Sequence, residues 1–393
     1  MSAHVMEECV VDGAMAVLLR LMRVVGMIPV RLEPRSAGFV VHYSFAQDVI
    51  ARLFYVCFGL LCIALELPNN ITQILLSDRP STKIILLLSI SVYVVLQVSI
   101  TIISVLKGYQ RTKQLCKNLS VIQKLNIEGV HDDAVANVEK RRCKLFILLL
   151  VSSQLFNVFE VILAKDNFTT SKEDYIYLIR KILQQIGIFS SVALQGEFVF
   201  SILSVHTPLQ ALNRRLGKML RDFKTNNERS IESAPKKLRK LATSYITLCD
   251  VMRTLNKENG LMMLMSFAAL LLRVTQSTFF LIIYWNNNPI TKIPFEETDL
   301  KKLCTRMLQS CRHLFALLEI IFMLEPCQWT YNEMEVTRLF VTRLAHYAST
   351  ANGPLVNELE MFYRLVFTNI PEYMPLQLIT LKRGFILEVF RIG

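Results

Sequence analysis

Long apolar stretches alternate along the chain with shorter polar segments that contain most of the lysines and arginines. A helix that crosses about 30 Å of hydrocarbon needs roughly 20 consecutive, mostly apolar residues. Six stretches reach this length, at about 49–67, 84–106, 145–164, 182–205, 261–285 and 303–325. The pattern therefore predicts an all-α fold: a polytopic membrane helical bundle with six recognisable spans within residues 49–325.

A further apolar region, at about 374–390, falls short of a span because Lys382 and Arg383 divide it. Two cations near the middle of a bilayer cost several kcal/mol on insertion scales. We therefore expect residues 326–393 to form a tail outside the hydrocarbon.

Positive charge between the spans predicts the orientation of the bundle. Lys and Arg total 31 in the segments that would share the side of the N-terminus, namely 1–48, 107–144, 206–260 and 326–393. They total 9 in the alternate loops 68–83, 165–181 and 286–302. Because basic loops stay in the cytoplasm, the sequence predicts a cytoplasmic N-terminus, with 1–48 and 326–393 both cytoplasmic.

Two glycosylation acceptors agree with this orientation. Asn70 and Asn167 each begin an Asn-x-Thr triplet, and both lie in predicted outer loops, whereas a third triplet, Asn118-Leu119-Ser120, falls on the predicted inner side. Such acceptors are modified on the outer side of the membrane.

The long inner loop 206–260 is amphipathic rather than irregular. Its apolar residues recur at spacings of three and four, which is typical of a helix with one buried face. We predict that spans four and five continue as long helices into the cytoplasm. The alternative is a pair of helices lying on an anionic lipid surface.

Composition excludes several classes of protein. Hydrophobic residues make up 52% and charged residues 19%, and the mean hydropathy is +0.38. Soluble domains carry about 25% charge, and disordered chains carry still more. The net charge of +12 lies between apolar runs instead of on one face, so we expect a lipid bilayer as the partner and no nucleic acid.

Motifs for catalysis or metal binding are absent from the sequence. The nine cysteines contain no CxxC pair, and the six histidines never pair at a spacing of four. Neither the spacing of a zinc site nor that of a metalloenzyme helix is present. We predict no metal, no cofactor and no enzymatic activity.

Polar side chains inside the spans are the candidate site. We expect a group of them at similar depth, in the central and outer part of the membrane, to bind a ligand: Tyr93, Asn157, Glu160, Gln185, Arg273, Gln276 and His313. A concave apolar site with a few polar groups suits small-molecule recognition. The alternative is structural, with buried ion pairs and hydrogen bonds between helices.

Several segments resemble the insect gustatory receptor family. They are Leu212-Asn213, the stretch LCDVMRTLNKENGLMMLMSF before span five, Cys327-Gln328-Trp329-Thr330 with Glu333 and Glu335, the segment ELEMFYRLVF with Phe362, and Gly384-Phe385-Ile386-Leu387-Glu388. The six spans, the cytoplasmic N-terminus and the long loop between spans four and five fit the same family.

This resemblance implies a seven-span chemosensory receptor in the plasma membrane of a sensory neuron. It implies a ligand-gated, non-selective cation channel that detects small-molecule tastants. It also implies a homo- or hetero-tetramer with other gustatory receptors.

The family's seventh helix, with its Thr-Tyr and Gln-Phe signature, is absent from this chain. Thr330-Tyr331 is followed by Asn-Glu-Met-Glu, and the sequence ends at Gly393. We therefore expect residues 326–393 to resemble the family's cytoplasmic anchor region, truncated before the pore helix. A non-conducting truncated or modulatory subunit is the alternative function.

Three other classes fit the sequence less well. A G-protein-coupled receptor has an outer N-terminus and Asp-Arg-Tyr and Asn-Pro-x-x-Tyr motifs, which this sequence lacks. A secondary transporter is typified by internal repeats and by spans broken with Gly and Pro, and neither is found. A membrane enzyme would need paired His or Asp motifs.

Overall fold

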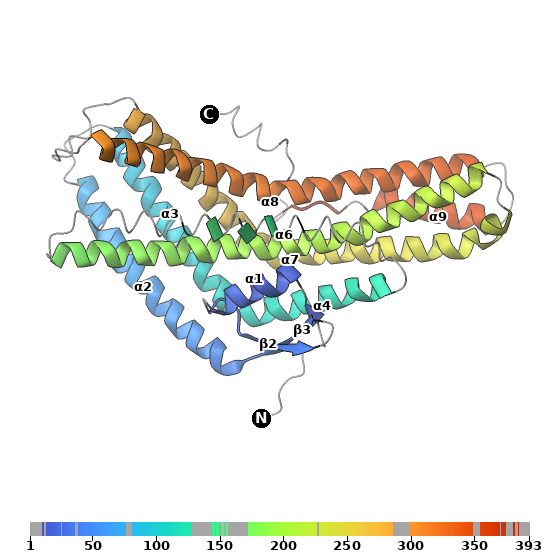
Figure 1. The fold of residues 1–393 in the computed structure, drawn as a ribbon, viewed down its shortest axis with the longest axis horizontal. Helices are drawn as coiled ribbons and strands as arrows, with labels where there is room; N and C mark the ends of the chain where they lie inside the picture. The colour runs from blue at the N-terminus through green and yellow to red at the C-terminus, as the bar shows by residue number, and fades with distance from the viewer. Residues whose placement is uncertain are drawn as a thin grey trace.

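The computed structural model is a bundle of long helices with a small β-sheet on one side (Figure 1). It describes residues 10–11, 13–24, 26–35, 38–75, 81–127, scattered positions between 141 and 155, 172–225, 228–285, 299–348, 354–369, 371–374, 380–381 and 384. The predicted third span at 145–164 and the apolar region at 374–390 lie largely outside these residues.

The N-terminal part contains a short helix and three short strands. They are β1 (Val10–Val11), α1 (Gly13–Val24), β2 (Val30–Arg35) and β3 (Gly38–Tyr43). β3 pairs antiparallel with both other strands, in the order β1-β3-β2. The sequence pattern did not predict this sheet, because strands of two to six residues leave no periodic signal comparable to that of a membrane span.

Helices α2 and α3 form the first two spans, as predicted. They are α2 (Phe45–Leu75) and α3 (Ser81–Leu106), and α4 (Gly108–Ile127) continues beyond α3 after one intervening residue. α2 packs extensively against α3. Asn70 lies near the C-terminal end of α2, and Asn167 lies outside the described residues.

The longest helices are α6 (Lys172–Lys224), α7 (Glu228–Trp285) and α8 (Asp299–Ala348), followed by α9 (Pro354–Thr368). Figure 1 shows the three long helices side by side, with α9 packed at the end of the molecule where α6 meets α7. Helical structure on both sides of 226–227 confirms that the loop 206–260 extends spans four and five. We call this part of the molecule, residues 206–260 and 326–369, the basic end.

Four of the described helices are long and apolar enough to cross a membrane. The stretches are Phe45–Leu65, Leu87–Leu106, Leu178–Lys224 and Ser233–Ile282, and they contain all of predicted span four and nearly all of spans one, two and five. The sixth predicted span is also helical, within α8, but it carries more charge. The helical membrane bundle is thus confirmed.

Two hydrophobic cores hold these elements together. The first joins α1, the sheet, α2 and α3 to the first half of α6. The second joins the later part of α6 to α7, α8 and α9. α6 therefore belongs to both cores and connects the membrane spans with the basic end.

Candidate functional site

A polar cluster lies where α3, α7 and α8 meet, and its centre is an ion pair. Arg273 on α7 directs Nη1 at both carboxylate oxygens of Glu319 on α8, at 2.9 and 2.8 Å. The two side chains are only 10% and 12% exposed. The pairing explains how two charges are tolerated among apolar helices, since an unpaired charge there is costly.

His313 extends the cluster along α8. Its Nδ1 lies 3.0 Å from Ser277 Oγ and 3.4 Å from Thr278 Oγ1 on α7. Both hydroxyls donate to the carbonyl oxygen of Val274, at 2.9 Å each. Because each hydroxyl has a single hydrogen, the imidazole nitrogen acts as the donor in this arrangement.

α3 supplies the third side of the cluster. Gln276 Nε2 on α7 donates to Ser89 Oγ on α3 at 3.4 Å. Tyr93 follows Ser89 by four residues and therefore lies on the same face of α3. It is 4% exposed and lies within electrostatic range of Arg273 and Glu319.

The structure thus brings four of the predicted ligand residues together, namely Tyr93, Arg273, Gln276 and His313. Gln185 lies on α6, and its amide oxygen is buried without a hydrogen-bond partner among the described residues. Asn157 and Glu160 lie outside the part of the chain that the structure describes. Their role in ligand binding stays a prediction.

The cluster is suited to recognition rather than to bond-making chemistry. It offers donors and acceptors of several kinds in a setting where water is scarce, and a polar ligand can replace some of these partners. Among the described residues, no group of three His, Cys, Asp or Glu side chains is placed to hold a metal ion.

A second buried ion pair joins α4 to α6. Arg111 Nε lies 3.0 Å from Glu197 Oε2, and Arg111 Nη1 donates to Ser104 Oγ at 2.6 Å. Both charged side chains are less than a tenth exposed. Glu197 lies within the fourth predicted span, and the structure shows it in a buried ion pair.

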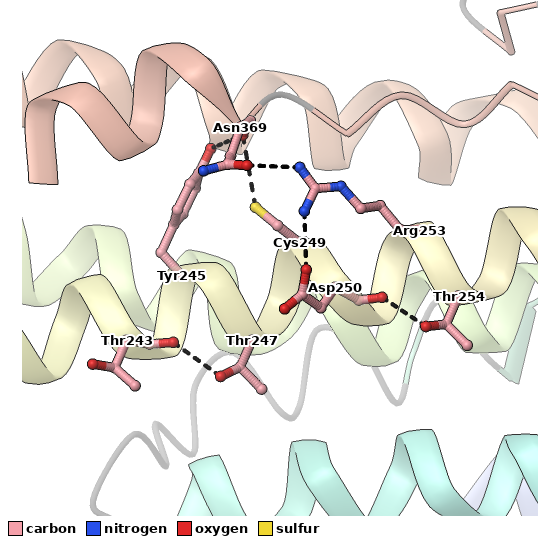
Figure 2. A network of polar contacts seen from close by, with 8 residues as sticks. All are labelled: Thr243, Tyr245, Thr247, Cys249, Asp250, Arg253, Thr254 and Asn369. Atoms are coloured by element: carbon pink, nitrogen blue, oxygen red, sulfur yellow. Dashed lines mark hydrogen bonds and ion pairs between the residues drawn. The ribbon is translucent and has the colours of Figure 1, made fainter.

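At the basic end, a polar network fixes the segment that follows α9 (Figure 2). Arg253 on α7 donates to Asn369 Oδ1 at 2.8 Å and to Asp250 at 2.9 Å. Tyr245 donates to the carbonyl oxygen of Asn369 at 3.4 Å, and the Cys249 thiol approaches the same oxygen at 3.9 Å. Sequence reasoning missed Asn369, because an Asn just after a helix is ordinary.

The same segment is fixed again a few residues later. Asn256 donates to the carbonyl oxygen of Glu372, and the Tyr373 amide donates to the Tyr331 hydroxyl. Burial raises the pKa of both phenols, so the two tyrosines stay neutral across the physiological range. The chain after α9 is therefore tied to both α7 and α8.

Residues that carried the family resemblance meet in this region. Asn213 on α6 donates to the backbone oxygen and carboxylate of Glu333, at 2.7 and 2.8 Å. Thr337 donates to Asn213 Oδ1 at 2.7 Å. Phe362 is completely buried and packs edge-on against Tyr245, with ring centroids 6.0 Å apart.

Comparison with known proteins agrees with this arrangement. The sequence model of the 7tm chemosensory receptor family matches residues 15–391. A comparison with curated proteins gives no match. Among solved structures, the chain is similar to the insect olfactory receptor OR5 from Machilis hrabei, with a TM-score of 0.65 and 10% identity over 96% of this chain and 94% of that chain.

The chain belongs to the 7tm chemosensory receptor family. The likeness to the olfactory receptor, at such low identity, shows the shared fold. The predicted class, a chemosensory receptor built as a helical membrane bundle, is thereby confirmed.

Proposed function

We propose that the chain is a gustatory receptor and a subunit of a ligand-gated, non-selective cation channel that detects small-molecule tastants. The observation that carries this proposal is the half-buried polar cluster around Arg273, Glu319 and His313, which lies between three helices of a chemosensory receptor. Its apolar surroundings suit bitter-type compounds better than sugars.

The long helices supply a path from the cluster to the basic end. α7 has 58 residues and α8 has 50, so they extend about 87 and 75 Å at 1.5 Å per residue. A ligand that favours one arrangement of the Arg273–Glu319 pair shifts the relative position of these helices. The shift is expressed as gating only if the ligand binds the open arrangement more tightly.

We further propose assembly with other gustatory receptors as a homo- or hetero-tetramer in the plasma membrane of a sensory neuron. The predicted orientation has the N-terminus in the cytoplasm. An epitope at residue 1 tests this directly, because it should stain only after cells are permeabilised.

The functional test is ligand-evoked cation influx in cells that express the full chain, alone and with other receptors of the family. Panels of tastants and of volatile odorants distinguish a gustatory receptor from an olfactory receptor. We expect responses to tastants, and a shift of at least about tenfold in the effective concentration for Arg273→Ala and His313→Ala, equal to roughly 1.4 kcal/mol of lost interaction.

One control and one combined variant make the test decisive. Arg364→Ala removes an exposed arginine on α9 and should leave the dose–response unchanged. A triple variant with alanine at Glu160, Arg273 and His313 should respond least. An unchanged dose–response in the triple variant would disprove the assigned site, and a response to volatile odorants alone would disprove the gustatory assignment.

A further inference from the structure

A cavity of about 440 Å³ lies between the turn after α1 and the first turns of α2, away from the polar cluster. Its lining is mostly apolar and includes Ile28, Ile50 and Phe54. Arg23 and Gln47 add a guanidinium and an amide group. The volume falls within the range of about 300–1,000 Å³ that small-molecule sites occupy.

The turn that forms one wall is firmly held. Gly26 has a φ of 79°, and its amide donates to the Arg23 carbonyl at 2.9 Å. Met27 donates to the Met22 carbonyl at 2.8 Å, and Met27 itself is completely buried. A Cβ atom at Gly26 would lie 3.6 Å from Ala51 Cβ, so the turn also approaches α2 closely. The cavity is therefore preformed.

The cavity opens onto an apolar surface. Val24, Ile50 and Phe54 line it and are 84%, 67% and 52% exposed. Leu53 on the same stretch of α2 is 64% exposed. α2 is one of the helices apolar enough to cross a membrane, so this surface faces lipid acyl chains when the protein is inserted.

The polar groups that line the cavity indicate the chemistry of its occupant. The two neighbouring arginines already have partners: Arg20 stacks over the Phe39 ring at 4.1 Å, and Arg52 pairs with Asp48 at 2.7 Å. Arg23 has no carboxylate partner among the residues that the structure describes. The Oε1 atom of Gln47 is buried and, within the same residues, accepts no hydrogen bond.

We propose that this cavity binds an anionic phospholipid with a hydroxylated headgroup, taken from the cytoplasmic leaflet. The phosphate pairs with the Arg23 guanidinium, a headgroup hydroxyl donates to Gln47 Oε1, and one acyl chain lies along Ile50 and Phe54. The start of α2 is the cytoplasmic end of the first span in the predicted orientation, and anionic lipids are concentrated in that leaflet.

The test is native mass spectrometry of the purified full chain with phosphatidylglycerol and with phosphatidylcholine of identical acyl chains. We expect the wild-type chain to bind phosphatidylglycerol about fivefold more tightly, which corresponds to one cationic contact. Arg23→Gln should abolish this preference, whereas Arg23→Lys should keep most of it. Ile50→Trp, which fills the cavity from an exposed position, should weaken the binding of both lipids.

Arg31→Gln is the matched control, because it makes the same change of charge at a side chain on β2 that is 69% exposed and does not line the cavity. Gel filtration and thermal melting of each variant establish that it is folded. Equal binding of the two lipids by the wild-type chain would overturn the headgroup contact. A preference that survives Arg23→Gln, or that Arg31→Gln removes equally, would place the lipid elsewhere.

Discussion

The first two spans and the basic end place their apolar side chains in opposite environments. In α2, 33% of the most apolar window is buried inside the protein, and Ile50 and Leu53 are 67% and 64% exposed. At the basic end, Val341 and Phe362 are completely buried under neighbouring helices. The same residue types thus face outward in one region and inward in the other.

The surrounding solvent explains this difference. Lipid chains are as apolar as Leu, so a span gains little by burying such a side chain against protein. The predicted orientation places the basic end outside the hydrocarbon, so we expect water to supply the driving force there, where each buried apolar side chain contributes about 1.5–3 kcal/mol. Polar contacts such as Asn213 to Glu333 and Arg253 to Asn369 then fix which helices meet there.

Removing a buried ring at the basic end should have the largest effect. Phe362→Ala deletes a fully buried side chain that contacts Tyr245, and we expect it to lower the free energy of unfolding by about 4 kcal/mol. Denaturant titration of the purified chain in detergent micelles measures this change.

The matched variant is Phe54→Ala, which removes the same ring from α2, where Phe54 is 52% exposed. We expect a loss of free energy of unfolding below about 1 kcal/mol. The Phe54 ring faces detergent or lipid, which is as apolar as the protein interior, so its removal costs little stability. Equal losses in the two variants would contradict the division of the molecule into a lipid-facing and a water-driven region.

The Arg111–Glu197 pair should rank next. Glu197→Leu leaves the Arg111 charge buried without its partner and should cost about 3 kcal/mol. The double variant with Arg111→Met should recover most of that loss, because two apolar side chains of similar size need no partner. Thermal melting in detergent ranks the three proteins.

An exposed pair provides the comparison for this experiment. Arg364 and Glu360 lie 2.6 Å apart on α9, with side chains 75% and 57% exposed. Arg364→Met should cost less than about 1 kcal/mol, as is usual for surface pairs. If the double variant at Arg111 and Glu197 were as unstable as the single one, the pair would have another role than mutual neutralisation.

The sequence predicted best those elements that extend over a long periodic or apolar stretch. Runs of about 20 apolar residues predicted α2, α3 and the spans within α6 and α7, because the bilayer imposes that length. The amphipathic spacing in 206–260 predicted the long extensions for a similar reason. The three strands near the N-terminus were not predicted, since they are short and pair within a small sheet.

Pairing between distant residues was only partly accessible from the sequence. Depth alone placed Tyr93, Arg273, Gln276 and His313 in one layer, and the structure shows them together. The depth of a residue in the membrane did not predict the pairing of Arg273 with Glu319, because the rotation of each helix about its axis decides which side chains face each other. The network around Asn369 depends on the non-helical segment after α9, which has no periodic signal in the sequence.

Asn213→Ala should have a smaller effect than the loss of a buried ring or charge. Asn213 makes hydrogen bonds of 2.7, 2.8 and 2.7 Å with Glu333 and Thr337, and its removal takes away a donor to the Glu333 carboxylate and an acceptor for the Thr337 hydroxyl. We expect a loss of about 2 kcal/mol in the free energy of unfolding. The control is Asn332→Ala, at an exposed position on α8 where the amide pairs with Gln328. It should lower the free energy of unfolding by less than about 0.5 kcal/mol. Equal losses in the two variants would contradict the proposed role of Asn213.

The smallest expected effect lies at Tyr43, which ends β3 just before α2. Burial, and then the hydrogen bond of 3.0 Å that its hydroxyl donates to Asp48, raise the pKa of Tyr43 from 10.0 to about 12. Because the pKa in the folded state is the higher one, this contribution to stability is complete below about pH 10 and is lost as the pH rises towards the folded value. The difference in melting temperature between the wild-type chain and Tyr43→Phe should therefore shrink as the pH rises from 10 to about 12. The tyrosinate absorbance of Tyr43, identified as the part that Tyr43→Phe removes, should appear near pH 12. Appearance of that absorbance at the ordinary pKa of a tyrosine would show that the Asp48 contact does not hold the hydroxyl.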